Sequence, residues 1–333
     1  MNKIGYFIAS LTLIVASCGV ESNRFKVEGR FLNLNQGEFY VYSIDNLIDG
    51  IDTIKVQGGR FAYDMQCERP GTLVLVFPNF SEQPLFAEPG EKVEVRGDAS
   101  HLKEMTVKGT DDNELMNKFR ESVVSASPPE VMRLASMFIK DHPASPVSAY
   151  LLRKYFITTS RVDYKQAYQL VQLLLKKQSR NGMLVQMKNK LEGLVQTIPN
   201  DPLPKFSAVG VNGEKLSQDI LNKAQVGVLS VWSTDNSESM NIQSMLKTKL
   251  RSAGGKLKIV SICMDPGKTS CKETLRRDSI SWANICDERM FEGAVAKKLG
   301  VYSIPYNIVL KNGKIVDRNL NSEQLRKKLE SML

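Results

Sequence analysis

The sequence predicts a multidomain α+β protein, because its side-chain pattern changes three times along the chain. Residues 25–107 alternate apolar and polar side chains, which is typical of half-buried β-strands. Residues 110–197 switch to the helical period, and buried strands then alternate with helices beyond a proline-rich linker at 198–204. The predicted parts are a signal peptide at 1–17, an all-β sandwich or barrel at 18–108, a helical connector at 109–198 and an α/β domain at 199–333.

Length and composition are those of a globular protein with two or three domains. The chain has 333 residues, of which 42% are hydrophobic and 24% charged. The net charge of +9 would favour anionic surfaces such as phospholipid headgroups or acidic glycans. A lysine-rich solvated face is the simpler explanation, and we favour it. The sequence contains no nucleic-acid-binding motif, so no nucleic-acid partner is predicted.

The N-terminus has the pattern of a bacterial secretion signal. Lys3 supplies a positive flank, and the apolar core at 4–16 is too short for a stop-transfer helix. The segment Val15-Ala16-Ser17-Cys18-Gly19 resembles a lipobox. That resemblance implies cleavage before Cys18 and lipidation of its thiol, which would tether the protein to a membrane of a Gram-negative-type cell envelope, facing the periplasm or on the outer-membrane surface. The alternative is an ordinary signal peptide with an incidental cysteine.

The predicted β domain has short strands separated by turn signals. Phe25, Val27 and Phe31 lie on one face of the first strand, and Gly58-Gly59 is a hairpin signal. The stretch 86–95, with Pro89-Gly90-Glu91 at its turn, resembles an N-terminal β domain of unknown function that is found in envelope lipoproteins. The resemblance brings no known active residue.

The helical connector has clear start and stop signals. Helix N-caps are available at 110–114, and Pro128-Pro129-Glu130 begins a second helix, which ends before His142-Pro143. His101 and His142 are the two histidines of the chain, and neither belongs to a metal-ligand motif or a Ser-His-Asp set. We therefore predict no metal site and no cofactor.

The C-terminal part begins with a first hairpin at 206–213 and centres on a buried strand at Val226–Trp232. This strand is followed by a turn and by a helix to about Leu250 that Asp235 or Asn236 can cap. The other expected elements are a strand at 257–262, a helix containing Leu275, a helix at about 291–299, a strand at 300–310, a hairpin turn at Asn312-Gly313 and a helix at 322–333.

The turn after Trp232 resembles the active-site turn of the thioredoxin fold, in particular that of TlpA-like and ResA-like envelope thiol-disulfide oxidoreductases. In that family the turn ends in Cys-x-x-Cys, and matching Trp232 places Asn236 and Ser239 at the two cysteine positions. Asparagine forms no thiolate, and a serine hydroxyl has no comparable leaving-group chemistry. The resemblance therefore implies a thioredoxin-like domain with a degenerate redox site and no catalytic residue at these positions.

The segment Ile304-Pro305 resembles the cis-proline strand of the same family. The resemblance implies that Pro305 is cis and faces the turn, and that the backbone of Ile304 pairs with an extended peptide. Trp232, Ile304 and Pro305 are accordingly the predicted binding residues.

Four cysteines follow Cys18, and an oxidising compartment would favour their pairing. Cys263 and Cys271 flank a predicted strand-to-helix loop, so a disulfide between them is one option. Cys286 is expected to be a buried thiol, and Cys67 lies in the β domain. We favour buried or bridged structural cysteines over a displaced catalytic pair.

These observations favour a membrane-anchored thioredoxin-like lipoprotein that is a non-catalytic binding or assembly module, with a peptide or protein in the old substrate groove. The alternative is a thiol-disulfide oxidoreductase that uses Cys263 with Cys271, or Cys286. A carbohydrate-acquisition accessory lipoprotein is a third option, which rests on the surface tether and the β domain.

Overall fold

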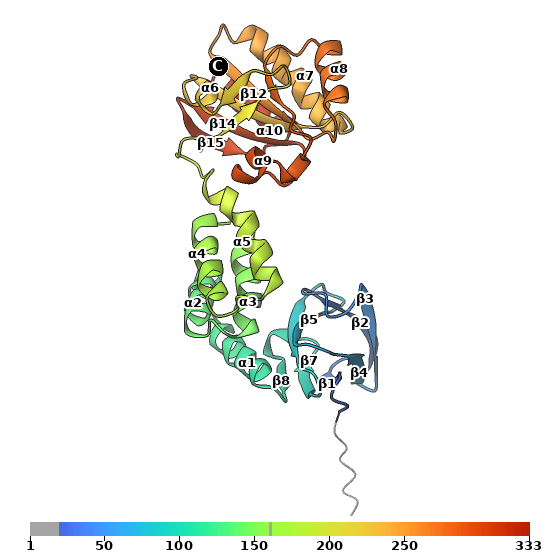
Figure 1. The fold of residues 1–333 in the computed structure, drawn as a ribbon. Coiled ribbons are helices and arrows are strands. Elements are labelled where there is room, and N and C mark those ends of the chain that lie inside the picture. Colours follow the sequence, from blue (N-terminus) through green and yellow to red (C-terminus); the bar gives the residue numbers. More distant parts are fainter. Residues whose placement is uncertain (1–19, 160–161) are drawn as a thin grey trace, which may run out of the picture. The chain divides into compact units, whose positions relative to one another are not determined.

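The computed structural model describes residues 20–159 and 162–333, so the predicted signal peptide and lipidation site Cys18 lie outside the described residues. The chain divides into two compact units, Met1–Leu151 and Leu152–Leu333. Figure 1 gives the course of the chain through both units. Among the described residues, no helix combines the length and the apolar character needed to cross a membrane.

The first unit is built on one nearly closed eight-stranded sheet with the order β6-β5-β2-β3-β4-β1-β7-β8 (Figure 1). Strand β1 joins its two halves, since it pairs antiparallel with β4 and parallel with β7. The predicted alternation places Phe25, Val27 and Phe31 in the core. The strands are β1 (Arg24–Leu32), β2 (Gln36–Ser43), β3 (Ile51–Gln57), β4 (Arg60–Gln66), β5 (Gly71–Val76), β6 (Glu82–Ala87), β7 (Lys92–Asp98) and β8 (Thr106–Lys108).

Helices follow the sheet and protect one of its edges. The buried amide of Asn113, on α1 (Asp111–Val123), accepts a hydrogen bond from the main-chain N–H of Phe86 and donates one to its carbonyl. Because β6 is an edge strand, this pairing satisfies backbone groups that would otherwise be open to another chain. The predicted start at Pro128 is confirmed by α2 (Pro128–Asp141), and α3 (Pro146–Leu152) ends at the boundary of the unit.

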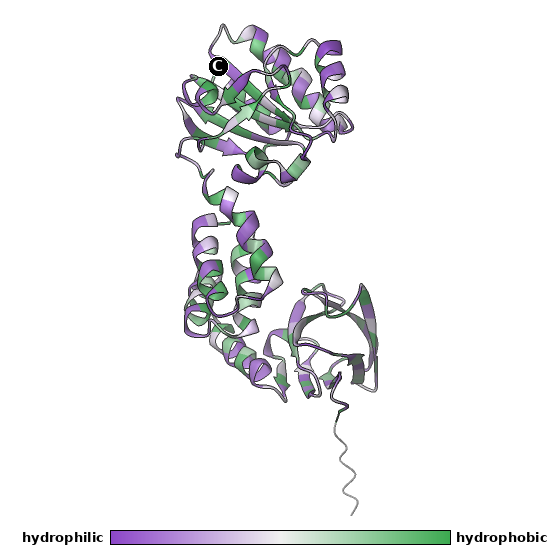
Figure 2. Cartoon of the chain, viewed as in Figure 1, coloured by the Kyte–Doolittle hydropathy of each residue, from purple (hydrophilic) through white to green (hydrophobic). Residues whose placement is uncertain are grey.

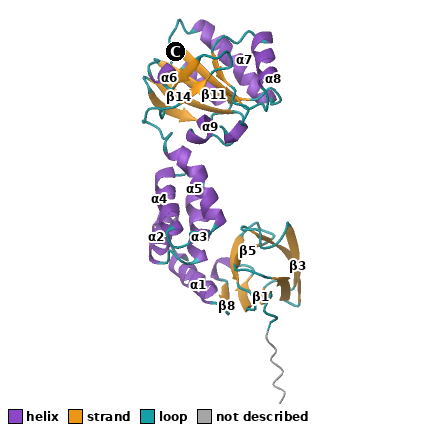
Figure 3. Ribbon diagram, in the orientation of Figure 1, coloured by secondary structure: helices purple, strands orange, loops and turns teal. Residues whose placement is uncertain are grey.

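The second unit contains a five-stranded sheet with the order β13-β12-β11-β14-β15. Strands β11, β12 and β13 are parallel, whereas β14 and β15 are antiparallel to their neighbours. Helices α7 and α10 pack on one face and α6 and α9 on the other, which with this order defines a thioredoxin-like fold (Figure 3). The strands are β11 (Val226–Trp232), β12 (Leu257–Cys263), β13 (Ala283–Ile285), β14 (Tyr306–Lys311) and β15 (Lys314–Arg318), with a small hairpin of β9 (Ser207–Val209) and β10 (Lys215–Ser217) before them.

Burial on both faces explains the continuous apolar character of the central strands. All seven residues of β11 are buried, and Figure 2 shows the strands of this sheet mostly in the hydrophobic colour. The helices of this unit are α4 (Tyr164–Leu175), α5 (Gly182–Val195), α6 (Asp219–Asn222), α7 (Ser237–Ser252), α8 (Lys268–Arg277), α9 (Ala294–Lys298) and α10 (Ser322–Glu330), together with a π-helical turn at Arg153–Ile157.

The helix predicted at about 291–299 is wrong. The structure has a short 3-10 turn, Met290–Glu292, and then the five-residue helix α9, with Gly293 between them in an extended conformation. A Cβ atom at Gly293 would come too close to the Asp287 carboxylate, so that side chain would have to move to admit a larger residue. The short elements β13 and α6 were not predicted, since runs of three or four residues carry little periodicity.

Helix α5 packs directly against the loop that leads to β14. Gly193 meets Gly300 so closely that a Cβ atom at Gly193 would collide with the backbone of Gly300 and Lys297. Close by, the hydroxyl of Tyr302 donates a hydrogen bond of 2.7 Å to the carbonyl of Asn189. This helix is therefore part of the same packed body as the sheet.

We expect Gly193→Ala to lower the free energy of unfolding of the second unit by about 2 kcal/mol, because the added methyl group meets rigid backbone. Gly182→Ala is the matched control in the first turn of the same helix, where a Cβ atom meets nothing within 4 Å. It should leave stability unchanged or raise it by roughly 0.5 kcal/mol. Urea denaturation followed by tryptophan fluorescence reports this unit, since Trp232 and Trp282 both lie in it. Equal effects of the two substitutions would contradict the packing argument.

Candidate functional site

The first part of the site is the turn between β11 and α7, where Asn236 is the N-cap. Its side-chain oxygen accepts a hydrogen bond of 2.8 Å from the main-chain N–H of Ser239, which satisfies one of the free donors of the helix start. The structure thus confirms one of the two predicted caps. The hydroxyl of Ser239 is completely buried and has no hydrogen-bond partner among the described residues. The helix end stays electropositive, but the turn presents no thiol.

A buried carboxylate that the sequence analysis missed holds this turn in place. Asp265, just beyond β12, is 2% exposed. It accepts hydrogen bonds from the hydroxyl of Ser233 at 2.8 Å and from the N–H and hydroxyl of Thr234 at 3.0 and 2.8 Å. The hydroxyl of Ser270 donates a further bond of 2.9 Å. An acidic residue directly after a buried strand, in the segment 263–267, was the signal that could have identified it.

These donors decide the protonation state of Asp265. Burial by itself raises the pKa of the carboxyl group, but the hydrogen bonds from Thr234, Ser233 and Ser270 outweigh burial and hold the pKa below its ordinary value. The group is therefore a carboxylate at neutral pH. It links the turn to the first turn of α8, which contains Ser270.

The second part of the site is the loop before β14. The peptide bond between Ile304 and Pro305 is cis, as the family resemblance implied. Tyr306 pairs with Val231 at the end of β11, so this loop lies at the same edge of the sheet as the turn after Trp232. Ile304 and Pro305 are half-buried. Trp232 is completely buried, so it supports the site from beneath and does not line a surface.

The main chain of this loop is free to pair with a partner. Strand pairing between β14 and β11 begins only at Tyr306. Within the described residues, the main-chain N–H of Ile304 makes no hydrogen bond. The neighbouring Ser303 is exposed, and Ile304 itself is half-buried.

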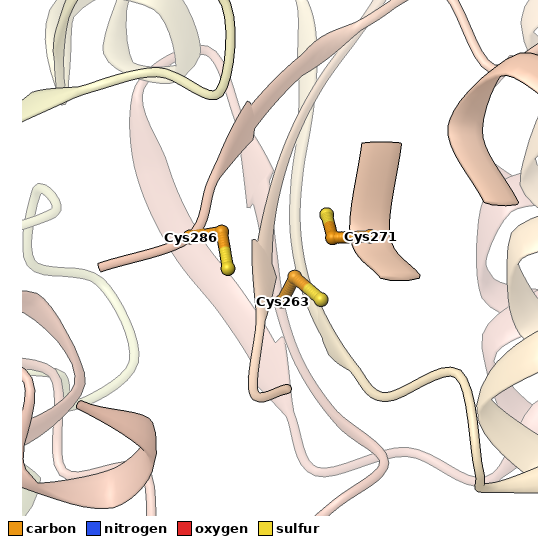
Figure 4. A group of neighbouring side chains, drawn as sticks. All are labelled: Cys263, Cys271 and Cys286. Atoms are coloured by element: carbon orange, nitrogen blue, oxygen red, sulfur yellow. The ribbon is translucent and has the colours of Figure 1, made fainter. Parts of the chain in front are cut away.

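The third feature is a group of three thiols behind the turn. Figure 4 shows Cys263 at the end of β12, Cys271 on α8 and Cys286 just after β13. Their sulfur atoms all lie within 4.8 Å of one another, and each side chain is at most 1% exposed. All three are free thiols, so the disulfide between Cys263 and Cys271 that the sequence allowed is absent from the structure. Cys67 is a fourth free and buried cysteine, in the first unit.

The surroundings of these sulfurs favour the neutral thiol. A hydrogen bond with Cys271 and burial both raise the pKa of Cys263 far above its ordinary value. Burial, with the nearby Cys263 adding to it, raises the pKa of Cys286 to about 11. Reactive cysteines have a lowered pKa and some exposure, so neither thiol has the character of a nucleophile. The two histidines, at 101 and 142, both lie in the first unit and contribute nothing to this group.

Comparison with known proteins gives a family match for part of the chain. Residues 25–116 match a family described as a domain of unknown function, DUF4369. A search of curated proteins found no match.

Solved structures of thioredoxin-like proteins resemble part of this chain. A domain assigned as the C-terminal domain of a thiol-disulfide oxidoreductase from Bacteroides thetaiotaomicron is 27% identical, with a TM-score of 0.37 over 41% of this chain and 97% of that one. A thiol-disulfide oxidoreductase from Bacteroides fragilis is 26% identical, with a TM-score of 0.36 over 40% and 100% of the two chains. A thioredoxin-like protein from Bacteroides caccae is 15% identical, with a TM-score of 0.43 over 61% and 78%.

We expect Asp265→Asn to lower the free energy of unfolding by about 2 kcal/mol near neutral pH, because an amide replaces a charged acceptor of several hydrogen bonds. The folded-state pKa of Asp265 is lowered, so its contribution is complete above the unfolded pKa of about 3.9 and is lost as the pH falls towards the folded value. The difference between wild type and variant should therefore shrink in acid. Urea denaturation at several pH values measures it.

The control for this prediction is Asp235→Asn, which makes the same chemical change at an exposed position of the same turn. It should change stability by no more than about 0.5 kcal/mol at any pH. A gap between wild type and Asp265→Asn that is constant from neutral to acid pH would show that the carboxylate charge is not what holds the turn.

Proposed function

We propose that this protein is a lipid-anchored, non-catalytic thioredoxin-like module of the cell envelope that binds an extended peptide or protein segment. The observation that carries the proposal is a thioredoxin-like edge with a capped helix start and a cis-proline loop, but without a cysteine in the turn 233–239. The thiols of the second unit lie behind this edge and are buried. The site thus keeps the groups that would bind an extended peptide, and it lacks the thiol that would reduce a disulfide of that peptide.

Binding at this edge would use main-chain pairing. An extended peptide that runs beside Ser303-Ile304 can accept a hydrogen bond from the free N–H of Ile304, in the manner of strand addition. Side chains of the peptide would then contact the turn around Asn236, where the helix dipole favours an acidic group.

The envelope location rests on the N-terminal sequence. The stretch that ends in Cys18-Gly19 resembles a lipobox, and a lipidated Cys18 would anchor the protein at a membrane surface. The predicted signal peptide before it supports export.

A thiol-disulfide oxidoreductase is the second candidate function, and one observation favours it. The sulfurs of Cys263, Cys271 and Cys286 are near enough to one another for a dithiol to close with a small movement. The burial of all three, and the raised pKa values of Cys263 and Cys286, argue against attack on an external disulfide, which requires an accessible thiolate.

The missing turn thiols give a direct test of the non-catalytic proposal. We expect residues 20–333 to show no reduction of insulin disulfides, because no thiolate is accessible. The double variant Asn236→Cys/Ser239→Cys should acquire this activity, since the helix start would lower the pKa of a thiol at position 236 by about one unit or more. Dithiothreitol-driven insulin turbidity measures both proteins.

The control is the single variant Ser239→Cys, which gains a thiol but no pair and should stay inactive. Insulin reduction by the wild-type protein that disappears on Cys263→Ser or Cys271→Ser would overturn the proposal and establish the oxidoreductase. Failure of the double variant to reduce insulin would show that the missing cysteines are not the only reason why this site is inactive.

The binding half of the proposal is tested at Ile304. Linear peptides selected from a phage-displayed random library on residues 20–333 should bind Ile304→Pro about tenfold more weakly, because proline removes the N–H donor. Ile304→Val keeps the donor and should bind like wild type. Fluorescence anisotropy of the labelled peptides gives the affinities, and tryptophan fluorescence checks the fold. Equal affinity for both variants, or no selectable peptide, would contradict binding at this loop.

A further inference from the structure

The register of three strand ends brings two of the three sulfurs together. Trp232 on β11 pairs with Cys263 on β12, and Ile262 pairs with Ile285 on β13. Cys286, one residue later, therefore lies next to Cys263 at the same end of the sheet. Helix α8 then covers this end with Cys271, so that three separate elements supply one sulfur each (Figure 4).

The three sulfurs are buried mainly among apolar side chains, with the main-chain carbonyl of Asp265 4.0 Å from the sulfur of Cys286. Val211, Trp232, Met240 and Leu275 pack with the cysteines in one cluster, and Cys271 is completely buried. This packing excludes water and larger molecules from the sulfurs. The only ligand that fits such an enclosed group is one small enough to bond to the sulfurs themselves.

The spacing of the sulfurs suits a single metal ion. Metal–sulfur bonds of about 2.3 Å place two sulfurs on one ion no more than about 4.6 Å apart, and about 4 Å apart in a trigonal arrangement. The three sulfurs lie within 4.8 Å of one another without an ion, so a small movement would bring them to these distances. The same spacing leaves no room for a cluster of several metal ions.

The number and type of ligands select the ion. Structural Zn²⁺ sites almost always have four ligands, and no histidine or carboxylate of the described residues joins this group of three. The nearest acidic side chain, Asp265, is fully occupied by its serine and threonine donors. Soft thiolate ligands without oxygen or nitrogen donors select Cu(I), which is satisfied by three ligands or two. We propose that Cys263, Cys271 and Cys286 form a buried three-sulfur site for Cu(I).

The negative charge of such a complex can be compensated by a nearby hydrogen-bond donor. Each thiol that becomes a ligand releases one proton, and the copper stays in the +1 state, so binding is an exchange of protons for a cation and not a redox step. Two or three thiolates around one Cu(I) leave a net negative charge. The indole N–H of Trp232, in the same cluster, is buried without a hydrogen-bond partner among the described residues and is a donor that an anionic sulfur site can use.

The test uses residues 20–333, purified under reducing, oxygen-free conditions. Cu(I) is supplied as its bathocuproine disulfonate complex, and loss of the complex's colour measures transfer to the protein. We expect one tightly bound Cu(I) per chain. X-ray absorption at the copper edge should report sulfur neighbours and no nitrogen or oxygen. This measurement on the wild-type protein does not depend on any variant folding.

Single variants then assign the site. Cys263→Ser, Cys271→Ser and Cys286→Ser should each weaken Cu(I) binding on the order of 100-fold or more, because each removes a ligand from the ion itself. Cys67→Ser is the matched control, since Cys67 is also a free buried cysteine but lies in the first unit. It should bind Cu(I) like wild type. Urea denaturation of each metal-free variant confirms that it is folded.

Several results would overturn the proposal. The protein could fail to take Cu(I) from bathocuproine disulfonate. X-ray absorption could show nitrogen or oxygen bound to the copper. The three cysteine variants could also be folded and bind Cu(I) with the affinity of wild type. Preference for Zn²⁺ over Cu(I) would also overturn it, as would a disulfide among the three cysteines in the protein as isolated from the cell envelope.

Discussion

The register of the parallel strands β11, β12 and β13 is the constraint on which the rest of the second unit depends. Their carboxyl ends stop together, and each is followed by a polar or sulfur-bearing residue at the same edge of the sheet. The turn after Trp232, the carboxylate of Asp265 and the thiol of Cys286 are neighbours because of this register. A shift of one residue in β12 would exchange the two faces of the strand and move Cys263 away from Cys286.

Asp265 connects the surface of this edge with its interior. Its side chain holds Ser233 and Thr234, while its main-chain carbonyl lies 4.0 Å from the sulfur of Cys286, which donates to it. A charged group at this depth is stable only because donors surround it, so the polar turn and the carboxylate require each other. The buried cluster of apolar side chains and thiols lies next to it, and burial raises the pKa of Cys263 and Cys286 there. The same few residues thus separate a polar surface from a sulfur-rich interior.

The sequence predicted the long elements of this fold well and the short ones poorly. The strand at Val226–Trp232 was predicted with its observed bounds, and the cis bond before Pro305 was implied by the family resemblance, because both lie in strong local patterns. The break at Gly293, where the backbone is extended between a 3-10 turn and α9, interrupts a run that the apolar pattern predicted as one helix. Strand β13 has three residues, and without it the register that unites Cys286 with Cys263 could not be predicted. For the same reason, the spacing of Cys263, Cys271 and Cys286 along the chain does not indicate a metal-ligand group.

The positions of the sulfurs decide what chemistry this unit can perform. A thiol at an exposed helix start is reactive, because the positive end of the helix stabilises a thiolate. Here the helix start is capped by the neutral side chain of Asn236, and the thiols are buried in one cluster with Trp232. Burial raises the pKa of a thiol, because a buried thiolate loses its hydration. A buried thiol is therefore a poor nucleophile towards large substrates. A buried thiol can still exchange its proton for a metal cation, because the cation compensates the negative charge of a thiolate that water does not hydrate.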